Sequence, residues 1–256
     1  MLYDIRTQKK ARCTLEQITN IPIAVWENEP ELCESTGDHI LSILDKYHER
    51  MIPFEDLDFM FAHLTSSNDK CNLYRQVGLL NLQSAYKTID SELRCFLDAK
   101  GVTIDIDQCL LYWNDERYNI SYHSSSPRQI YSGVDELCHR IAYRFYKDYA
   151  VCGFLSKGAH AYATNVEEKP EILIDIGDLI GVDIATEWKY THTPYEITAK
   201  VSSNDIKPIG DMLNYAELAF WNAFNEEIDQ YILICKDYVQ IPPNDIISIQ
   251  EFSGWF

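Results

Sequence analysis

Residues 59–67 read FMFAHLTSS, and we expect the rest of the chain to be arranged around this stretch. Its first half is a short apolar run of the kind that forms a buried strand. Its second half, from His63 to Ser67, is rich in side chains that donate and accept hydrogen bonds. Residues 68–77 then fit a short helix, and Gly78 is the residue type at which helices often end. A strand that carries a histidine and hydroxyls to its own end, and then turns into a helix, is typical of a binding site, although a single histidine at a strand end also commonly has a purely structural role.

The composition is that of an ordered globular protein with a strong negative charge. The chain has 256 residues, of which 46% are hydrophobic and 12% aromatic, so it can bury a substantial core. Its formal net charge of -18 opposes non-specific binding to nucleic acids and to anionic membranes. The charge favours a soluble protein or one with a basic partner.

The cysteines and the apolar segments predict the cellular environment. The eight cysteines are scattered singly, without a C-x-x-C pair, which is typical of reduced thiols rather than of a disulfide frame or a zinc site. The first residues, MLYDIR, lack the apolar region of a signal peptide, and no run approaches the roughly 20 apolar residues of a membrane span. We therefore expect a cytoplasmic protein with no membrane contact and no bound metal.

The hydrophobic periodicity predicts an α+β fold. Helices are expected at residues 35–47, 68–77, 86–97, 133–149 and 212–224, and strands at residues 57–64, 102–106, 109–112, 118–122, 159–165, 172–176, 186–190, 195–201 and 231–235. One hairpin is expected around residues 114–117 and another around residues 192–194. Because no linker interrupts the chain, we expect a single domain over residues 1–256, with a mostly helical N-terminal extension (1–55) and a core (56–256).

Three polar strand ends together resemble the ADP-ribosyltransferase fold in its His-Tyr-Glu form. This group includes the poly-ADP-ribose polymerases, and the chain also resembles the DNA-modifying ADP-ribosyltransferase toxins of bacteria. His63 and Thr65, followed by a helix and by Gly78-Leu79, match the family's first motif. Tyr162 matches its central aromatic residue and Glu196 its late strand that opens with a glutamate. The resemblance extends over about residues 57–250, although Tyr162 lies far enough from His63 to require an insertion.

The resemblance implies a split β-sheet core and NAD as the substrate. His63 would hydrogen-bond the ribose, Thr65 and Ser66 would also contact NAD, and Tyr162 would stack on the nicotinamide ring. Glu196 would be the catalytic carboxylate, because cleavage of the nicotinamide–ribose bond passes through an oxocarbenium-like state that a carboxylate stabilises.

A second glutamate is the alternative catalytic residue. The strand at residues 231–234 and its Pro-Pro exit resemble the family's closing strand equally well, and Glu227 stands just before it. If neither glutamate serves, the site is degenerate. With either one, the resemblance implies transfer of ADP-ribose to an unidentified macromolecule, as in a bacterial toxin or defence protein. An antitoxin or a regulatory protein would then be a partner.

Two other classes of function stay open from the residues. Asp175, Asp178 and Asp183, followed by residues 187–189 (EWK), fit the acid-then-Glu-x-Lys pattern of magnesium-dependent nucleases. The acidic composition also fits a non-catalytic protein that binds a basic partner. Residues 122–125 (YHSS) form an alternative first motif, but they lack the Gly-Leu that follows His63.

Overall fold

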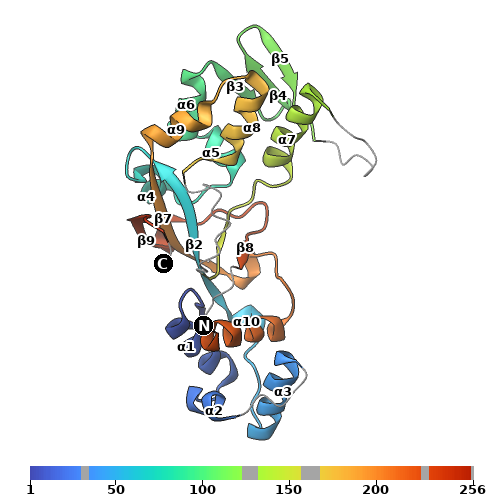
Figure 1. Ribbon diagram of the computed structural model, residues 1–256, viewed down its shortest axis with the longest axis vertical. Coiled ribbons are helices and arrows are strands. Elements are labelled where there is room, and N and C mark those ends of the chain that lie inside the picture. The colour runs from blue at the N-terminus through green and yellow to red at the C-terminus, as the bar shows by residue number, and fades with distance from the viewer. Residues whose placement is uncertain (30–34, 123–131, 157–167, 226–230, 255–256) are drawn as a thin grey trace.

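The computed structural model describes residues 1–29, 35–122, 132–156, 168–225 and 231–254. The molecule is elongated, with a central sheet between a helical layer at each end (Figure 1). We call the end that contains the N-terminal helices the lower layer and the opposite end the upper layer. This combination of helices with antiparallel sheets confirms the predicted α+β class.

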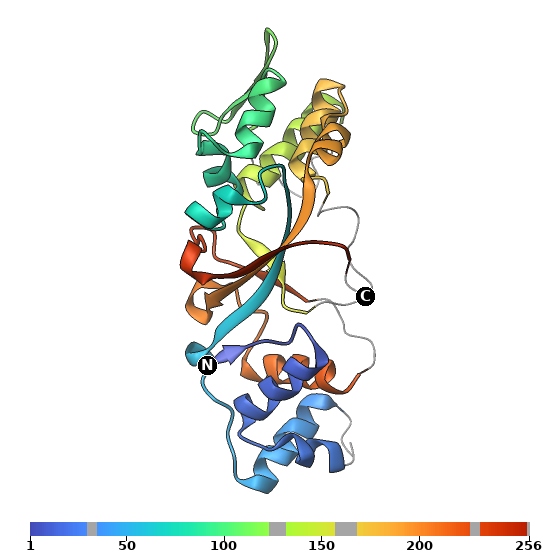
Figure 2. The ribbon, with the colours of Figure 1, turned by 90° about the vertical axis from the view of Figure 1, so that its left-hand side faces the viewer.

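The central sheet is built on β2, which is the strand expected from residues 59–67. The described strands of this sheet are β1 (Leu2–Tyr3), β2 (Asp58–Ser67), β6 (Cys152–Phe154), β7 (Thr193–Ser202), β8 (Ile232–Ile234) and β9 (Ile246–Glu251). Their order is β8-β6-β2-β7-β9, and β1 pairs with β2 in parallel. β2 and β7 pair along their whole length, from Asp58 opposite Ser202 to Ser67 opposite Thr193. Figure 2 shows β2 running along the middle of the molecule towards the upper layer.

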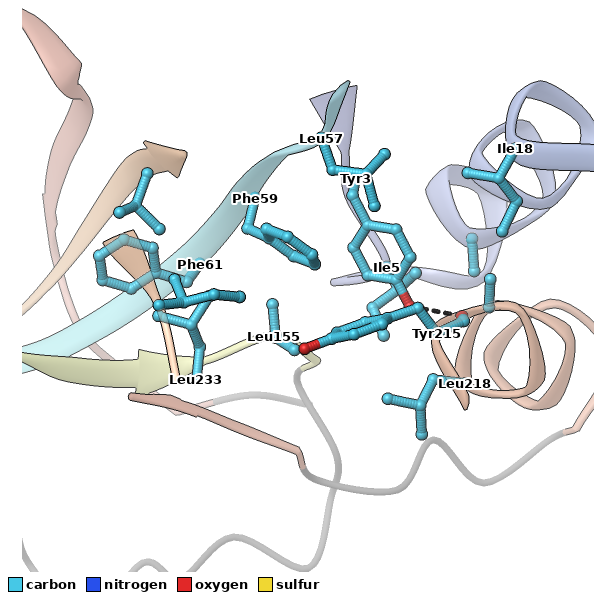
Figure 3. Close-up of a cluster of buried hydrophobic side chains, with 14 of the residues drawn as sticks. Tyr3, Ile5, Ile18, Leu57, Phe59, Phe61, Leu155, Tyr215, Leu218 and Leu233 are labelled. Atoms are coloured by element: carbon cyan, nitrogen blue, oxygen red, sulfur yellow. Dashed lines mark hydrogen bonds between the residues drawn. The ribbon is translucent and has the colours of Figure 1, made fainter. Parts of the chain in front are cut away.

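The lower layer packs helices from both ends of the sequence against one another. Its elements are α1 (Gln8–Thr19), α2 (Ile23–Asn28), α3 (Thr36–Tyr47) and α10 (Met212–Phe224), with the short 3-10 helices η1 (Phe54–Asp56) and η2 (Ser203–Asp205) beside it. A core of aromatic side chains joins this layer to the sheet (Figure 3). The Tyr3 hydroxyl donates to the backbone oxygen of Tyr215 over 2.8 Å, and the rings of Phe59 and Tyr215 lie 5.1 Å apart.

The upper layer has a hydrophobic core of its own. It contains α5 (Leu82–Lys87), α6 (Glu92–Ala99), α7 (Val134–Tyr146), α8 (Glu171–Ile180), α9 (Ile184–Thr191) and the meander β3 (Val102–Asp105), β4 (Leu110–Trp113) and β5 (Glu116–Asn119). The helix α4 (Asn72–Val77) follows β2 directly and ends at Gly78, as expected, while the 3-10 helix η3 (Pro243–Asp245) precedes β9. The hairpin around residues 114–117 is confirmed by the pairing of β4 with β5.

Two of the expected strands are helices. Residues 172–176 belong to α8, which Gly181 ends in a left-handed conformation, and residues 186–190 belong to α9, which Asp183 caps. A short apolar run cannot by itself distinguish a buried strand from a buried helix, and in α8 the buried residues continue to Ile180 at helical spacing. The expected hairpin around residues 192–194 is therefore wrong, because β7 pairs with β2 and β9 instead.

The single helix expected at residues 86–97 is also divided. It forms α5 and α6, because the Ser91 side chain caps a new helix by accepting from the backbone nitrogen of Arg94. The strand expected at residues 159–165 lies outside the described residues. Among the helices that the structure describes, none has both the length and the apolar character needed to cross a membrane.

Candidate functional site

A cavity of about 250 Å³ lies where the end of β2 meets the upper layer. β6 pairs with β2 only at Ala62 opposite Phe154, and the cavity follows the edge of β2 beyond that point. The described residues that line the cavity are His63, Leu64, Thr65, Ser66, Leu73, Tyr74, Val77, Gly78, Leu80, Leu82, Ala85, Ser91, Glu92, Leu93, Asp148, Tyr149, Ala150, Val151, Cys152, Pro170, Ile172 and Trp188. The structure thus brings His63, Thr65 and Ser66 to one cavity, as expected for a site at this strand end.

His63 is held in place by a backbone carbonyl. Its Nδ1 lies 2.8 Å from the oxygen of Cys152, and because a carbonyl only accepts, Nδ1 carries the hydrogen. Burial lowers the pKa of His63, and the bond to Cys152 opposes this effect only in part. The ring is therefore neutral near pH 7, and its Nε2 is a hydrogen-bond acceptor.

The two hydroxyl residues of β2 have different partners. Thr65 Oγ1 lies 3.0 Å from the hydroxyl of Tyr74, whose pKa burial raises to about 12. Both hydroxyls are neutral, and each can either donate a hydrogen bond to a ligand or accept one from it. Ser66 Oγ accepts from Trp188 Nε1 over 2.7 Å, which ties α9 to β2. Ser66 therefore has a structural role in addition to its place on the cavity wall.

Glu92, at the start of α6, is a cavity residue that the sequence did not reveal. Its carboxylate accepts from Ser67 Oγ over 2.6 Å and from the backbone nitrogens of Asn68 and Asp69 over 3.1 and 3.3 Å. Burial, followed by the hydrogen bond with Asp69, raises the pKa of Glu92 to about 7. A carboxyl that titrates near neutral pH in a cavity is a candidate for acid–base or electrostatic chemistry.

His192 stands behind this carboxyl. Its ring stacks on Trp188 at a centroid distance of 3.5 Å, and its Nδ1 lies 3.0 Å from the Trp188 backbone oxygen. Nε2 lies 3.4 Å from Glu92 Oε2 and has no hydrogen-bond partner among the described residues. Burial lowers the pKa of His192, so Nε2 is an acceptor facing a carboxyl oxygen. Two acceptors at this distance repel, which favours the protonated form of Glu92.

Glu196 does not reach the cavity, although it was the expected catalytic carboxylate. In the β2–β7 ladder Glu196 stands opposite Leu64 and Ile197 stands opposite His63. Because successive side chains of a strand point to opposite faces, Glu196 and His63 lie on opposite faces of the sheet. β7 also lies on the other side of β2 from the cavity edge.

The contacts of Glu196 belong to a buried polar network. Its Oε1 lies 3.5 Å from Thr198 Oγ1 and 3.4 Å from Gln250 Nε2, and Thr198 in turn accepts from Arg6 over 2.7 Å. Arg6 is ion-paired with Asp4 at 2.9 Å. The network joins the N-terminal segment to β7. Tyr162 and Glu227, the other expected site residues, lie outside the described residues.

The acids of the nuclease alternative are engaged in ion pairs or helix capping, and Asp175 and Asp178 share Arg140. Asp175 contacts Arg140 and Arg144, Asp178 lies 3.0 Å from Arg140, Asp183 caps α9, and Glu187 pairs with Lys100. Within the described ranges no group of three or more His, Cys, Asp or Glu residues is placed to hold a metal ion. In the alternative motif at residues 122–125, the Tyr122 ring stacks on His139 with centroids 5.6 Å apart, while residues 123–125 lie outside the described part.

The cavity is partly apolar, and its walls include residues from β2, β6, α4, α5, α6 and α9. Its polar groups include a neutral histidine, a pair of hydrogen-bonded hydroxyls and one half-buried carboxyl. Comparison of the chain with family models, curated proteins and solved structures finds no match.

Proposed function

We propose that this protein is an NAD-dependent ADP-ribosyltransferase that uses the cavity at the end of β2. The observation that carries the proposal is that His63 and Thr65, from the motif that resembles this family, line one cavity together with the half-buried carboxyl of Glu92. We propose Glu92 in the role that the resemblance would give to Glu196, since Glu92 lines the cavity and Glu196 does not.

The chemistry needs a binding surface for ribose and one negative charge near the reacting carbon. The bond from ribose C1′ to the nicotinamide nitrogen breaks, and its electron pair leaves with nicotinamide. An acceptor nucleophile then bonds to C1′ and releases a proton. A carboxylate beside the ribose stabilises the positive charge that develops at C1′ and can take up the released proton.

Several residues of the cavity wall have a role in this scheme. Nε2 of His63 can accept from a ribose hydroxyl, and the Thr65–Tyr74 pair can exchange hydrogen bonds with a second one. The partly exposed rings of Tyr74 and Tyr149 offer aromatic surface on the same cavity. At about 250 Å³ the cavity is near the lower end of ligand pockets, roughly 300–1,000 Å³, so it would enclose the nicotinamide-ribose end of NAD and leave the remainder outside.

Labelled NAD tests the proposal even though the acceptor is unidentified. The protein is incubated with adenylate-labelled NAD and a cell extract, and both nicotinamide release and label on total protein and nucleic acid are measured. We expect both signals from the wild type and a loss of at least about 100-fold in Glu92→Gln. His63→Ala should also lose activity.

Two control variants separate the cavity from other sites. Asp90→Asn removes the same charge from an exposed position two residues before Glu92 and should remain active. Glu196→Gln should retain activity if it folds, because its carboxyl does not line the cavity. A wild type that neither binds NAD nor releases nicotinamide refutes the proposal, and a selective loss in folded Glu196→Gln refutes the role of Glu92.

A further inference from the structure

The charges around the cavity are unusually one-sided for a nucleotide site. Among the described residues that line it, none is lysine or arginine, whereas Glu92 and Asp148 are acidic. Asp148 is exposed, and Arg144 balances it at 2.9 Å. The neutral ring of His63 adds no charge. Glu92 is therefore the lining carboxyl that has no cation within ion-pair distance among the described lysines and arginines.

We propose that Glu92 makes this cavity selective for a positively charged aromatic ring over an uncharged ring of the same shape. The ligand class is an N-substituted pyridinium, such as the nicotinamide ring of oxidised NAD. This inference rests on the proposed function for its biological ligand, but the selectivity belongs to the cavity and can be measured without any reaction.

The surroundings of Glu92 strengthen such a charge interaction. Its side chain is 17% exposed, and Leu73, Leu82 and Ile172 supply apolar wall to the same cavity. Partial burial reduces the screening that weakens surface charge pairs. The partly exposed rings of Tyr74 and Tyr149 also line the cavity, and aromatic faces attract cations. A phosphate, by contrast, meets a carboxyl of like charge and no lysine or arginine on the described wall.

The proton on Glu92 gives the selectivity a definite pH dependence. A cation in the cavity favours the ionised carboxylate, so its binding displaces the proton that Glu92 carries below a pKa of about 7. Affinity for the cation should therefore rise between pH 6 and pH 8. Affinity for an uncharged ring should stay nearly constant.

The titratable groups next to Glu92 do not reverse the expected rise in cation affinity between pH 6 and pH 8. Burial raises the pKa values of Cys71 and Tyr74 to about 12, so both are neutral from pH 6 to pH 8. The hydrogen bonds of Asp69 with Glu92 and Ser67 outweigh the effect of its burial and lower its pKa, so Asp69 stays ionised. His192 resists taking the proton, because burial lowers its pKa.

Two small probes that differ in one methyl group and one charge test the inference. 1-Methylnicotinamide is a permanent pyridinium cation, and nicotinamide is its uncharged counterpart. Dissociation constants are measured by ligand-observed NMR at pH 6 and pH 8 for the wild type, Glu92→Gln and Asp90→Asn. At pH 8 we expect the wild type and Asp90→Asn to bind the cation about tenfold more tightly than nicotinamide.

Glu92→Gln should remove this preference and the pH dependence together. Equal binding of the two probes by the wild type, no binding of either, or a preference that survives in Glu92→Gln overturns the inference. The thermal unfolding midpoint checks that Glu92→Gln is folded, and if it is not, the pH series on the wild type decides. Turnover of NAD without probe selectivity would refute this inference alone, whereas selectivity without turnover would support it and refute the transferase.

Discussion

The raised pKa of Glu92 should be visible in the stability of the whole protein. Its pKa rises from an ordinary 4.5 to about 7 on folding, with burial as the largest cause. Between these two values the carboxyl is protonated in the folded state and ionised in the unfolded state. The folded state binds more protons in this window, so the contribution of Glu92 to the free energy of unfolding falls as pH rises from 4.5 to 7.

The size of the effect follows from the same shift. A pKa change from 4.5 to about 7 corresponds to about 3 kcal/mol, and we expect about 2 kcal/mol after allowance for partial exposure of the side chain. Glu92→Gln cannot ionise but keeps an oxygen that accepts from the backbone nitrogens of Asn68 and Asp69. Relative to the wild type, the variant should therefore gain stability between pH 5 and pH 8.

Urea unfolding at pH 5 and pH 8 measures this difference directly. Other groups titrate in the same range, notably His63 and His192, but they are present in both proteins and their effects largely cancel in the comparison. Asp90→Asn provides the control for loss of one negative charge from the same turn. If wild type and Glu92→Gln show parallel pH profiles, the carboxyl is not protonated in the folded state at neutral pH, and the reasoning on its proton fails.

Two further substitutions test how the cavity walls are built. Gly78→Ala should cost more than about 4 kcal/mol in urea unfolding, because its φ is +87° and a Cβ would lie 1.9 Å from a backbone carbonyl oxygen. Gly101→Ala, at φ +71° with nothing within 4 Å, carries only the backbone strain of about 1–2 kcal/mol, and an equal cost for both would contradict the close contact at Gly78. Trp188→Phe should cost about 1–3 kcal/mol more than Trp221→Phe, because it leaves the buried Ser66 hydroxyl without its indole donor, whereas Trp221 is 45% exposed. Equal unfolding midpoints for the two tryptophan variants would show that the bond to Ser66 contributes little.

The sequence pattern correctly predicted those elements in which hydrophobic periodicity and turn or capping residues agree. β2, the β4–β5 hairpin and α10 combine clear periodicity with turn or capping residues, and all three occur close to their expected positions. α8 shows where pattern fails, because five residues near the start of a buried helix, 172–176, can be as apolar as a strand. Only the continuation of the helical spacing to Ile180 separates the two.

The candidate site was predictable in part for a related reason. His63, Thr65 and Ser66 are adjacent on one strand, so a single correct element brings all of them to the cavity. Glu92 comes from α6, 25 residues after Ser67, and only the tertiary contact between that helix and the end of β2 makes it a neighbour. The capping serine at position 91 marks the start of a helix, but no local signal states what that helix start will face.

The register of β2 and β7 also explains why Glu196 was a misleading candidate. The sequence predicts that this glutamate lies near the start of a late strand, but it does not predict which face of the sheet the side chain points to. A shift of one residue in the strand register changes that face. Here the pairing of Leu64 with Glu196 puts the carboxyl into the network with Thr198 and Arg6. That network gives Glu196 a structural role, since Thr198 connects it to the buried guanidinium of Arg6. Any catalytic carboxylate that acts with His63 must therefore come from another element, and α6 supplies one.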